Sequence, residues 1–408
     1  MGNKFLLSVE VKKFIRDKSP KIAILAPSLD TVPSQQGGAI YCLIEDIAFY
    51  SAYPIIVFSK FKHDLRKSKI SNRIIYYTEP IKKTVIQSLI GHRLRKKIYG
   101  ISGTENIQYA NDVYQFCIKN QIKCLVVEDS NSLLAGVPDN PDVPIILHQH
   151  ANALLGHSLH YFQKFTKKLS GIIFVSETNR KDVNEKFGNL KIPNTHIYNG
   201  VNLKNFISFT TQESGSLRNP FISGNKTIIL LFAGRIHPSK GIKELLCSFE
   251  FLKEFDIKVL IAGDLETQYD YNSAFENEIK FLMTGKTILL GTVPQERLPQ
   301  YYALCDFVIV PSTGPEGLPK VVTEALVMGK PVIASNRGGI MELVINGKNG
   351  IIIEEPISPE NIAKAIIGAI KNKEIITSNA HVQQEIYRSR FSAESMAAQF
   401  DDFLRNYL

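Results

Sequence analysis

Two carboxylates flank a short segment in the second half of the chain, Glu316-Gly317-Leu318-Pro319-Lys320-Val321-Val322-Thr323-Glu324. Gly317 and Pro319 are typical of a loop that turns into a helix, because proline is suited to the first helical turn. The backbone N–H groups of Leu318 and Lys320 would then lie at a helix start, where unpaired amides and the helix dipole favour an anion. The motif therefore predicts an anion cradle with a carboxylate on each side, which suits a sugar diphosphate.

Two other interpretations of this segment stay open at this point. It could be an ordinary helix N-terminus with an acidic first turn. It could also be the acid and nucleophile pair of a glycosidase, whose carboxyl groups lie roughly 5 to 9.5 Å apart. Eight helical steps of about 1.5 Å place Glu324 about 12 Å beyond Glu316, so the glycosidase pair requires the loop to fold Glu316 back.

A second motif supplies cations. Arg235 and Lys240 lie in the stretch 233–241, directly after a predicted strand at 227–232. The stretch lacks the Gly-Lys-Ser/Thr ending of a Walker loop, but arginine can grip two phosphate oxygens and lysine supplies a point charge. The alternative is a helix-start loop with two surface cations.

Short apolar runs alternate with helical patterns along the whole chain, which predicts an α/β fold with mostly parallel sheets. In the first half the predicted strands are 21–26, 55–59, 73–77, 124–127, 144–148, 171–175 and 196–198. In the second half they are 227–232, 258–262, 287–290, 307–310, 331–334 and 350–353. Each half has enough strands for a sheet of its own. Ligands of such sheets bind beyond the carboxyl ends of the strands, and both motifs lie there.

The first half offers two further candidates at strand ends. Gly37 and Gly38 lie in the loop after the first strand and open a predicted helix at 39–49. A simple tight turn is the alternative for this glycine pair. His148 and His150 end the strand near 144–148, where the alternative is a core or merely solvent-facing histidine.

The order of these motifs resembles the C-terminal, nucleotide-sugar-binding domain of GT-B glycosyltransferases of family 4. The resemblance is carried by Gly-Arg…Lys-Gly at 234–241, the Glu-x7-Glu segment and Gly-Lys-Pro-Val-Ile-Ala at 329–334. It covers residues 226–350 strongly and the first half more loosely, and Asn202 stands where the family usually has aspartate. The resemblance implies two Rossmann-like domains facing across a cleft. The expected parts are an acceptor-binding domain at 1–205, a linker at 206–226, a nucleotide-sugar domain at 227–388 and a helix at 389–408 that packs back on the first domain.

The resemblance further implies transfer of a hexosyl or N-acetylhexosaminyl group from a nucleotide-diphosphate donor with retention, by front-face attack in which the leaving phosphate helps to deprotonate the acceptor. Arg235, Lys240 and the helix start would neutralise the leaving diphosphate, Glu316 would bind sugar hydroxyls, and Glu324 would hold the ribose. His150 would orient the sugar or the acceptor, with His148 as the close runner-up. The expected donor-binding residues are Gly37, Gly38, Arg235, Lys240, Val293, Glu316, Gly317, Leu318, Pro319, Lys320 and Glu324.

No Asp-x-Asp motif occurs in the sequence, and no cofactor is expected. Metal-dependent transferases of the other main fold use that motif to hold the diphosphate through a divalent ion. Here two cations and a helix start would do so, which predicts a metal-independent enzyme. A UDP-sugar donor and a glycan or lipid-linked acceptor of cell-surface polysaccharide or lipopolysaccharide synthesis are the preferred substrates.

The charge is uneven. Residues 1–205 carry 28 Lys and Arg against 16 Asp and Glu, and residues 206–408 carry 20 against 23, which together give the net +9. Within 60–97 twelve basic residues alternate with apolar ones, a pattern that suits a solvated face or an anionic membrane surface. No base-reading motif accompanies the charges, so nucleic acid is not expected as a partner.

Five scattered cysteines without metal-like spacing fit reduced thiols, and the first 20 residues do not resemble a signal peptide. The expected location is the cytoplasm, with a peripheral position on the inner face of the membrane if the basic cluster binds lipid. Two alternative functions remain: a sugar-nucleotide-binding subunit without catalysis, and a nucleotide-sugar epimerase on the same scaffold.

Overall fold

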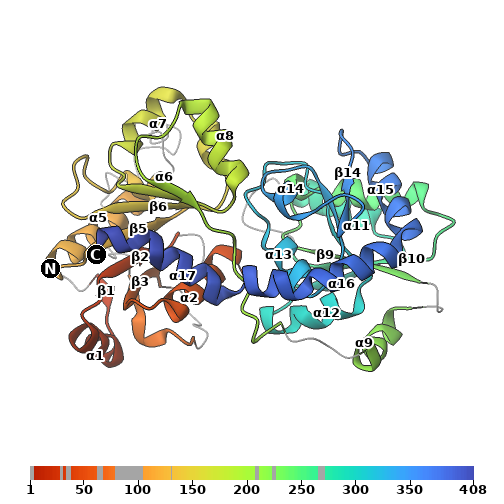
Figure 1. Cartoon of the computed structure of the whole chain (residues 1–408), viewed down its shortest axis with the longest axis horizontal. Coiled ribbons are helices and arrows are strands. Elements are labelled where there is room, and N and C mark those ends of the chain that lie inside the picture. The colour runs from red at the N-terminus through yellow and green to blue at the C-terminus, as the bar shows by residue number, and fades with distance from the viewer. Residues whose placement is uncertain are drawn as a thin grey trace. The chain divides into compact units, whose positions relative to one another are not determined.

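The computed structural model describes residues 4–27, 31–33, 38–61, 68–78, 104–129, 131–206, 211–222, 227–264 and 272–408. The chain forms two compact units (Figure 1). The first consists of Met1–Val175, Arg180–Ile197 and Met396–Leu408, and the second of Ser176–Asn179 and Tyr198–Ser395. Each unit is described by itself below.

The described residues of the first unit build an eight-stranded sheet in the order β1-β4-β3-β2-β5-β6-β7-β8. Only β1 runs antiparallel, beside β4. The strands are β1 Phe5–Leu6, β2 Ile22–Leu25, β3 Ile55–Lys60, β4 Ile74–Tyr77, β5 Cys124–Glu128, β6 Ile145–Gln149, β7 Gly171–Phe174 and β8 Asn194–His196. The central strands are mostly apolar and end in polar residues, as in Cys124–Glu128 and Ile145–Gln149, and helices cover both faces of the sheet, as is usual for a parallel sheet.

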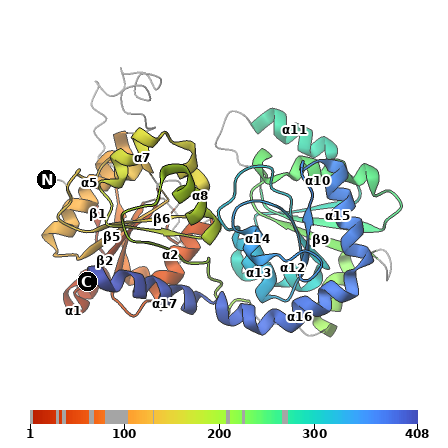
Figure 2. The same ribbon diagram turned by 45° about the horizontal axis from the view of Figure 1, so that its top comes forward.

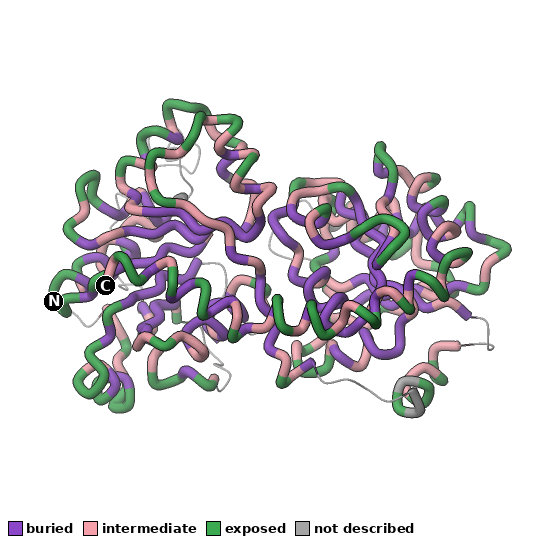
Figure 3. The backbone as a smooth tube through the Cα atoms, in the orientation of Figure 1, coloured by how far each residue is buried: buried purple, intermediate pink, exposed green. Residues whose placement is uncertain are grey.

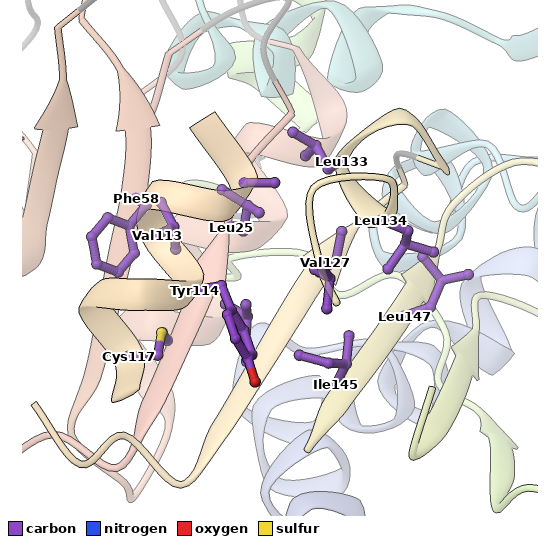
Figure 4. Close-up of a cluster of buried hydrophobic side chains, with 14 of the residues drawn as sticks. Leu25, Phe58, Val113, Tyr114, Cys117, Val127, Leu133, Leu134, Ile145 and Leu147 are labelled. Atoms are coloured by element: carbon purple, nitrogen blue, oxygen red, sulfur yellow. The ribbon is translucent and has the colours of Figure 1, made fainter. Parts of the chain in front are cut away.

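Helices cover the two faces of this sheet. On one face Tyr114 and Val113 pack against Leu25 and Val127 (Figure 4). The opposite face packs against α2 and α17, where Phe400 lies in the same apolar cluster as the strands (Figure 2). The helices that lie wholly or largely in this unit are α1 Val9–Lys18, α2 Ala39–Tyr50, α5 Thr104–Lys119, α6 Asn131–Leu134, α7 Leu159–Thr166, α8 Glu177–Phe187 and α17 Ala393–Leu404.

The end of the chain belongs to the first unit although it follows the second in sequence. The carboxylate of Asp401 accepts hydrogen bonds from Ser51 Oγ at 2.5 Å and from the Ala52 amide at 2.7 Å. The hydroxyl of Tyr407 donates to the Ser170 carbonyl at 3.0 Å. These polar contacts and the buried Phe400 fix α17 on the sheet.

The second unit contains a six-stranded parallel sheet in the order β11-β10-β9-β12-β13-β14 among the residues described. The strands are β9 Ile228–Ala233, β10 Ile257–Ala262, β11 Thr287–Gly291, β12 Phe307–Val310, β13 Val332–Ser335 and β14 Gly350–Ile353. The helices are α9 Thr211–Arg218, α10 Ile242–Ser248, α11 Asn272–Leu282, α12 Leu298–Leu304, α13 Lys320–Val327, α14 Ile340–Leu343, α15 Pro359–Lys371 and α16 Lys373–Arg390. In Figure 3 the central strands of each unit are buried, and most exposed residues lie on helices and loops.

Short 3-10 segments join several of these elements. They are η1 Ser71–Arg73, η2 Asn152–Gly156, η3 Asn219–Phe221, η4 Pro238–Lys240, η5 Phe249–Phe251, η6 Gln295–Arg297 and η7 Arg405–Tyr407.

The α/β fold class predicted from the sequence is confirmed, and every predicted strand appears, the one at 196–198 shifted to Asn194–His196. The short edge strand β1 was not predicted, because two residues carry no periodic pattern. The division between the compact units falls after Ile197 rather than at 205, because Tyr198 bonds to Glu342 and Asn199 to the Leu318 carbonyl, both in the second unit. Part of the expected linker 206–226 forms α9.

Candidate active site

The second sheet reverses its strand order between β9 and β12. From β9 the sheet continues through β10 to β11, and from β12 it continues through β13 to β14. In open parallel sheets a ligand binds beyond the carboxyl ends of the strands at such a reversal. The loop after β9 carries Lys240 and the loop after β12 carries Glu316, so the two predicted motifs meet at the position that the topology favours.

Lys240 and Glu316 form the centre of this cluster. Lys240 Nζ lies 2.6 Å from Glu316 Oε1, and the hydroxyl of Ser312 donates to the same oxygen at 2.6 Å. The Glu316 side chain is 9% exposed and that of Lys240 is 26% exposed. Both bonds end on Oε1, so Oε2 has no partner among the described residues and remains available to a ligand. Ser312 was not among the predicted site residues.

The two loops lie against each other because glycines allow it. Gly241 has a φ of +68°, and a Cβ there would lie 1.9 Å from the Pro311 carbonyl oxygen. Gly338, after β13, has a φ of +49°, and its Cβ would lie 2.0 Å from the Glu316 carbonyl oxygen. Backbone bonds from Thr313 and Gly314 to the Ser239 carbonyl, at 3.0 and 2.9 Å, complete the packing. Side chains larger than hydrogen at 241 and 338 would separate the loops.

The helix start lies where the motif predicted it, with a small shift. Pro319 is the N-cap of α13 and Lys320 its first residue, so the proline precedes the first turn instead of lying in it. The carbonyl groups of Gly317 and Leu318 accept hydrogen bonds from the Gly339 amide at 2.7 Å and from Asn199 Nδ2 at 2.7 Å. These bonds hold the loop that leads into the helix and fix the direction of its first amides.

Glu324 lies on α13 and is buried, together with Lys320. Tyr302 on α12 donates its hydroxyl to Glu324 Oε2 at 2.7 Å, and Lys320 Nζ lies 3.7 Å from Oε1. Burial and the adjacent carboxylate raise the pKa of Tyr302 well above its ordinary value, so its phenol remains a donor. Tyr302 was missed in the sequence because a tyrosine in an apolar helical stretch resembles any core residue.

The remaining predicted donor-binding residues are less tied to this cluster. Arg235 lies on the loop after β9 with its side chain exposed, and Val293 follows β11 half-buried. Gly38 is the N-cap of α2 in the first unit. Gly37 lies outside the described residues.

In the first unit, Glu128 ends β5 and lies between His148, which is in β6, and His150, which directly follows β6. Glu128 Oε2 is 2.6 Å from His150 Nε2 and 3.1 Å from His148 Nδ1. Burial alone would raise the pKa of Glu128, but the charges and hydrogen bonds of the two imidazoles lower it to about 2. Burial also disfavours a charged imidazole, yet the hydrogen bond and charge of Glu128 outweigh it and raise the pKa of His150.

Asp129, the next residue, holds the backbone around His150. Its Oδ1 accepts hydrogen bonds from the amides of His150 and Ala151 at 3.0 and 3.2 Å and from Gln149 Nε2 at 2.5 Å. Asp129 has a φ of +39°, an uncommon conformation for a residue with a side chain. Glu128 and Asp129 were not predicted, although they follow the strand 124–127 in the same way that His148 follows its own.

The ligand atoms of Glu128, His148 and His150 lie within 4.8 Å of one another, close enough to raise the question of a metal ion. Hydrogen bonds between the carboxylate and both imidazoles already account for this arrangement. The cluster therefore needs no ion to explain why three polar side chains are buried together.

Most of the basic cluster 60–97, including Arg93-Leu94-Arg95-Lys96-Lys97, lies outside the described residues. Of its described members, Arg73 donates to the Ala48 carbonyl and Lys69 lies 5.4 Å from the centre of the Phe49 ring. These two side chains therefore have structural contacts. A search of the described helices found none that is long and apolar enough to span a bilayer.

Comparison with known proteins relates part of the chain to a family. The model of the family "Glycosyl transferases group 1" matches residues 216–388. The lipopolysaccharide 1,2-N-acetylglucosaminetransferase of Salmonella typhimurium is 33% identical over 199 residues, which is 47% of this chain and 52% of that protein. The chain thus spans about half the length of that relative. The putative glycosyltransferase YtcC of Bacillus subtilis is 24% identical over 90% of this chain and 88% of its own.

Solved structures give the fold. The crystal structure of Anabaena HepE in complex with UDP and glucose superposes with a TM-score of 0.72 at 22% identity, covering 95% of this chain and 99% of that one. Sucrose-phosphate synthase from Thermosynechococcus elongatus gives 0.74 at 17% identity, covering 95% and 98%. The segment that matches the family model lies within the second unit, and both sheets fit the two-domain structures. Residues 216–388 are therefore similar to the glycosyl transferases group 1 family, and the two units are the Rossmann-like domains of a GT-B fold.

Proposed function

We propose that this chain transfers a sugar from a nucleotide-diphosphate donor, preferably a UDP-sugar, to a glycan or lipid-linked acceptor, with retention at the anomeric carbon and without a metal ion. The observation that carries the proposal is the Lys240–Glu316 pair at the β9/β12 strand reversal, whose carboxylate is buried. It combines a cation for a diphosphate with a carboxylate that keeps one oxygen for a sugar hydroxyl.

The reaction breaks the bond between the anomeric carbon and the diphosphate, forms a bond to an acceptor oxygen, and moves the acceptor proton to a leaving phosphate oxygen. Negative charge therefore grows on the diphosphate. Lys240, the exposed Arg235 and the first amides of α13 would stabilise that charge. A preorganised donor of this kind contributes about 3–4 kcal/mol to the transition state. Glu316 Oε2 would accept a hydrogen bond from a sugar hydroxyl and fix the ring.

Metal independence follows from the same charges. A divalent ion in other transferases neutralises the diphosphate, and here Lys240 and Arg235 would do so, while the sequence has no Asp-x-Asp motif to hold an ion. Full activity after EDTA treatment is the expected result. Loss of activity in EDTA with recovery in manganese or magnesium would contradict this part of the proposal.

The acceptor class is proposed from the relatives. One is named a lipopolysaccharide transferase and another, from Staphylococcus aureus, a capsular polysaccharide biosynthesis glycosyltransferase. Such acceptors would bring the enzyme to the cytoplasmic face of a membrane, where the basic cluster 60–97 would contribute about 1 kcal/mol per cation near anionic lipid. Flotation with vesicles that contain or lack anionic lipid tests this, and equal partitioning would contradict it.

The donor is tested first by thermal shift with UDP-, GDP-, ADP- and CMP-sugars. A ligand at a hundredfold above its dissociation constant adds about 2.7 kcal/mol of stability, which a melting curve resolves. NMR of the product then reports whether the anomeric configuration is retained. Stabilisation by no sugar nucleotide, or conversion of the donor to an epimer without acceptor, would overturn the proposed function.

A further inference from the structure

Three buried polar atoms without partners gather in one short segment after β6. They are Gln149 Oε1, His150 Nδ1 and Asn152 Oδ1, and none has a hydrogen-bond partner among the described residues. Buried polar atoms in native proteins are nearly always paired, so a group of unpaired ones within four residues requires an explanation. The orientation of the Gln149 amide is fixed, because its nitrogen donates to two acceptors, Asp129 Oδ1 and the Ala151 carbonyl.

Glu128 decides whether His150 Nδ1 is a hydrogen-bond donor or an acceptor. This carboxylate is fully buried and ionised, so it can only accept a hydrogen bond. At 2.6 Å from Oε2, His150 Nε2 must therefore carry the proton. In the neutral imidazole the proton on Nε2 leaves a lone pair on Nδ1. While the imidazole is neutral, all three unpaired atoms are therefore hydrogen-bond acceptors. Glu128 also raises the pKa of His150, and in the charged imidazole Nδ1 carries a proton and donates.

We infer that Glu128 is a positioning residue, which fixes His150 with its proton on Nε2 so that Nδ1, Gln149 Oε1 and Asn152 Oδ1 together accept hydrogen bonds from the hydroxyl groups of a sugar. The identity of the ligand rests on the proposed function. With His150 neutral, the group contains only acceptors, which repel a phosphate or carboxylate and suit a molecule that presents several O–H donors. Water is the alternative occupant, and the experiments below separate the two.

His148 takes a different part in this arrangement. Its Nδ1 lies 3.1 Å from Glu128 Oε2, and its ring is enclosed, with the centre of the Phe400 ring 6.1 Å away. His148 thus also contacts the Glu128 carboxylate, and its side chain is almost fully buried. The structure thereby assigns the ligand-facing role to His150 and an internal role to His148.

The tautomer of His150 is measured directly by long-range ¹H–¹⁵N NMR of protein labelled at histidine, at about pH 9, where the imidazole is mostly neutral. The signal is assigned by its loss in His150→Gln. The expected result is a proton on Nε2 in the unmodified protein and a shift toward Nδ1 protonation in Glu128→Gln, whose amide can donate to Nε2. A proton on Nδ1 in the unmodified protein, or no change in Glu128→Gln, would overturn the inference.

Transfer kinetics test the ligand. Glu128→Gln should lower kcat by about 10- to 100-fold while leaving the Kd of UDP unchanged, because the loss is confined to one hydrogen-bonded group. Glu128→Asp, which keeps the charge, should retain the tautomer and more of the activity. In a protein that already carries His150→Gln, adding Glu128→Gln should cause little further loss of kcat. If the tautomer shifts but kcat does not, water rather than a sugar occupies the group and the inference fails.

Asp401→Asn is the matched control, because it neutralises another buried carboxylate of the same unit, which among the described residues bonds to Ser51 and Ala52. It should change neither the His150 tautomer nor kcat. Melting curves of all variants separate folding defects from the local effect. The NMR result is independent of transfer activity, so an inactive protein with the expected tautomer would contradict the proposed function and leave the role of Glu128 intact.

Discussion

Replacing Lys240 with methionine removes the ammonium group but keeps an unbranched side chain of similar length. Glu316 then keeps only the hydrogen bond from Ser312, at 2.6 Å, and remains 9% exposed. Breaking a fully buried ion pair in this way costs about 3–5 kcal/mol. Lys240 is 26% exposed and Oε2 of Glu316 is open to water, so we expect a smaller loss of about 1–3 kcal/mol in the free energy of unfolding.

The same substitution should weaken nucleotide binding more visibly than it weakens the fold. A hydrogen bond to a charged group contributes about 1.5–3 kcal/mol, which corresponds to an increase of about 10- to 150-fold in the Kd of UDP. Isothermal titration calorimetry at fixed salt and 20 °C measures this change. Calorimetric melting of the same samples gives the stability loss, at about 2–4 °C for each kcal/mol in a unit of this size.

Lys243→Met is the matched control, because Lys243 forms an ion pair of the same length, 2.6 Å, with Glu278 in the same unit. The side chains of Lys243 and Glu278 are 44% and 42% exposed, so water and salt screen the pair, and it lies away from the strand reversal. We expect UDP binding and melting close to those of the unmodified protein. If Lys240→Met binds UDP within threefold of the unmodified protein, Lys240 does not hold the diphosphate and the proposed site is wrong.

Three further outcomes follow from individual contacts. Glu324→Gln should weaken UDP more than 2′,3′-dideoxy-UDP if this carboxylate holds the ribose, and titration calorimetry with both nucleotides measures the ratio. Asp306 accepts hydrogen bonds from Arg218 and the Ile229 amide, both at 2.8 Å, and lies 2.6 Å from Lys373 Nζ. Burial alone would raise its pKa, but these three contacts outweigh burial and lower it. Asp306→Asn should cost about 1–3 kcal/mol near pH 7, and the difference should shrink as pH falls below about 4, because the native carboxylate loses its contribution on protonation. Asp401→Asn should lower the melting temperature of the first unit without changing the Kd of UDP, as seen by calorimetry.

Much of the fold follows from patterns that lie within short windows of sequence. A buried parallel strand such as 307–310 is apolar throughout and is followed by glycine, proline or serine, so its position and the loop after it can be recognised without neighbours. The helix start at Lys320 was predicted because glycine and proline restrict the backbone locally. The resemblance to a known family added the roles of Lys240 and Glu316, since spacing alone left an ordinary helix start open.

The pairings within the site could not be predicted because they depend on which strands become neighbours. Lys240 and Glu316 are 76 residues apart, and their contact at 2.6 Å exists only because β9 and β12 lie side by side at the strand reversal.

Glu128 was missed for the same reason. A carboxylate at the end of an apolar strand is a solvated residue in most proteins, and nothing within a window of its sequence indicates that the next strand in the sheet brings two histidines against it. Once β5 and β6 are paired, Glu128 lies opposite His148. A buried charge needs partners, and the register of the two strands brings the histidines to it. The chemistry of His150 is therefore a property of the sheet, and a substitution that disturbs the pairing of β5 with β6 should change its tautomer even when Glu128 is retained.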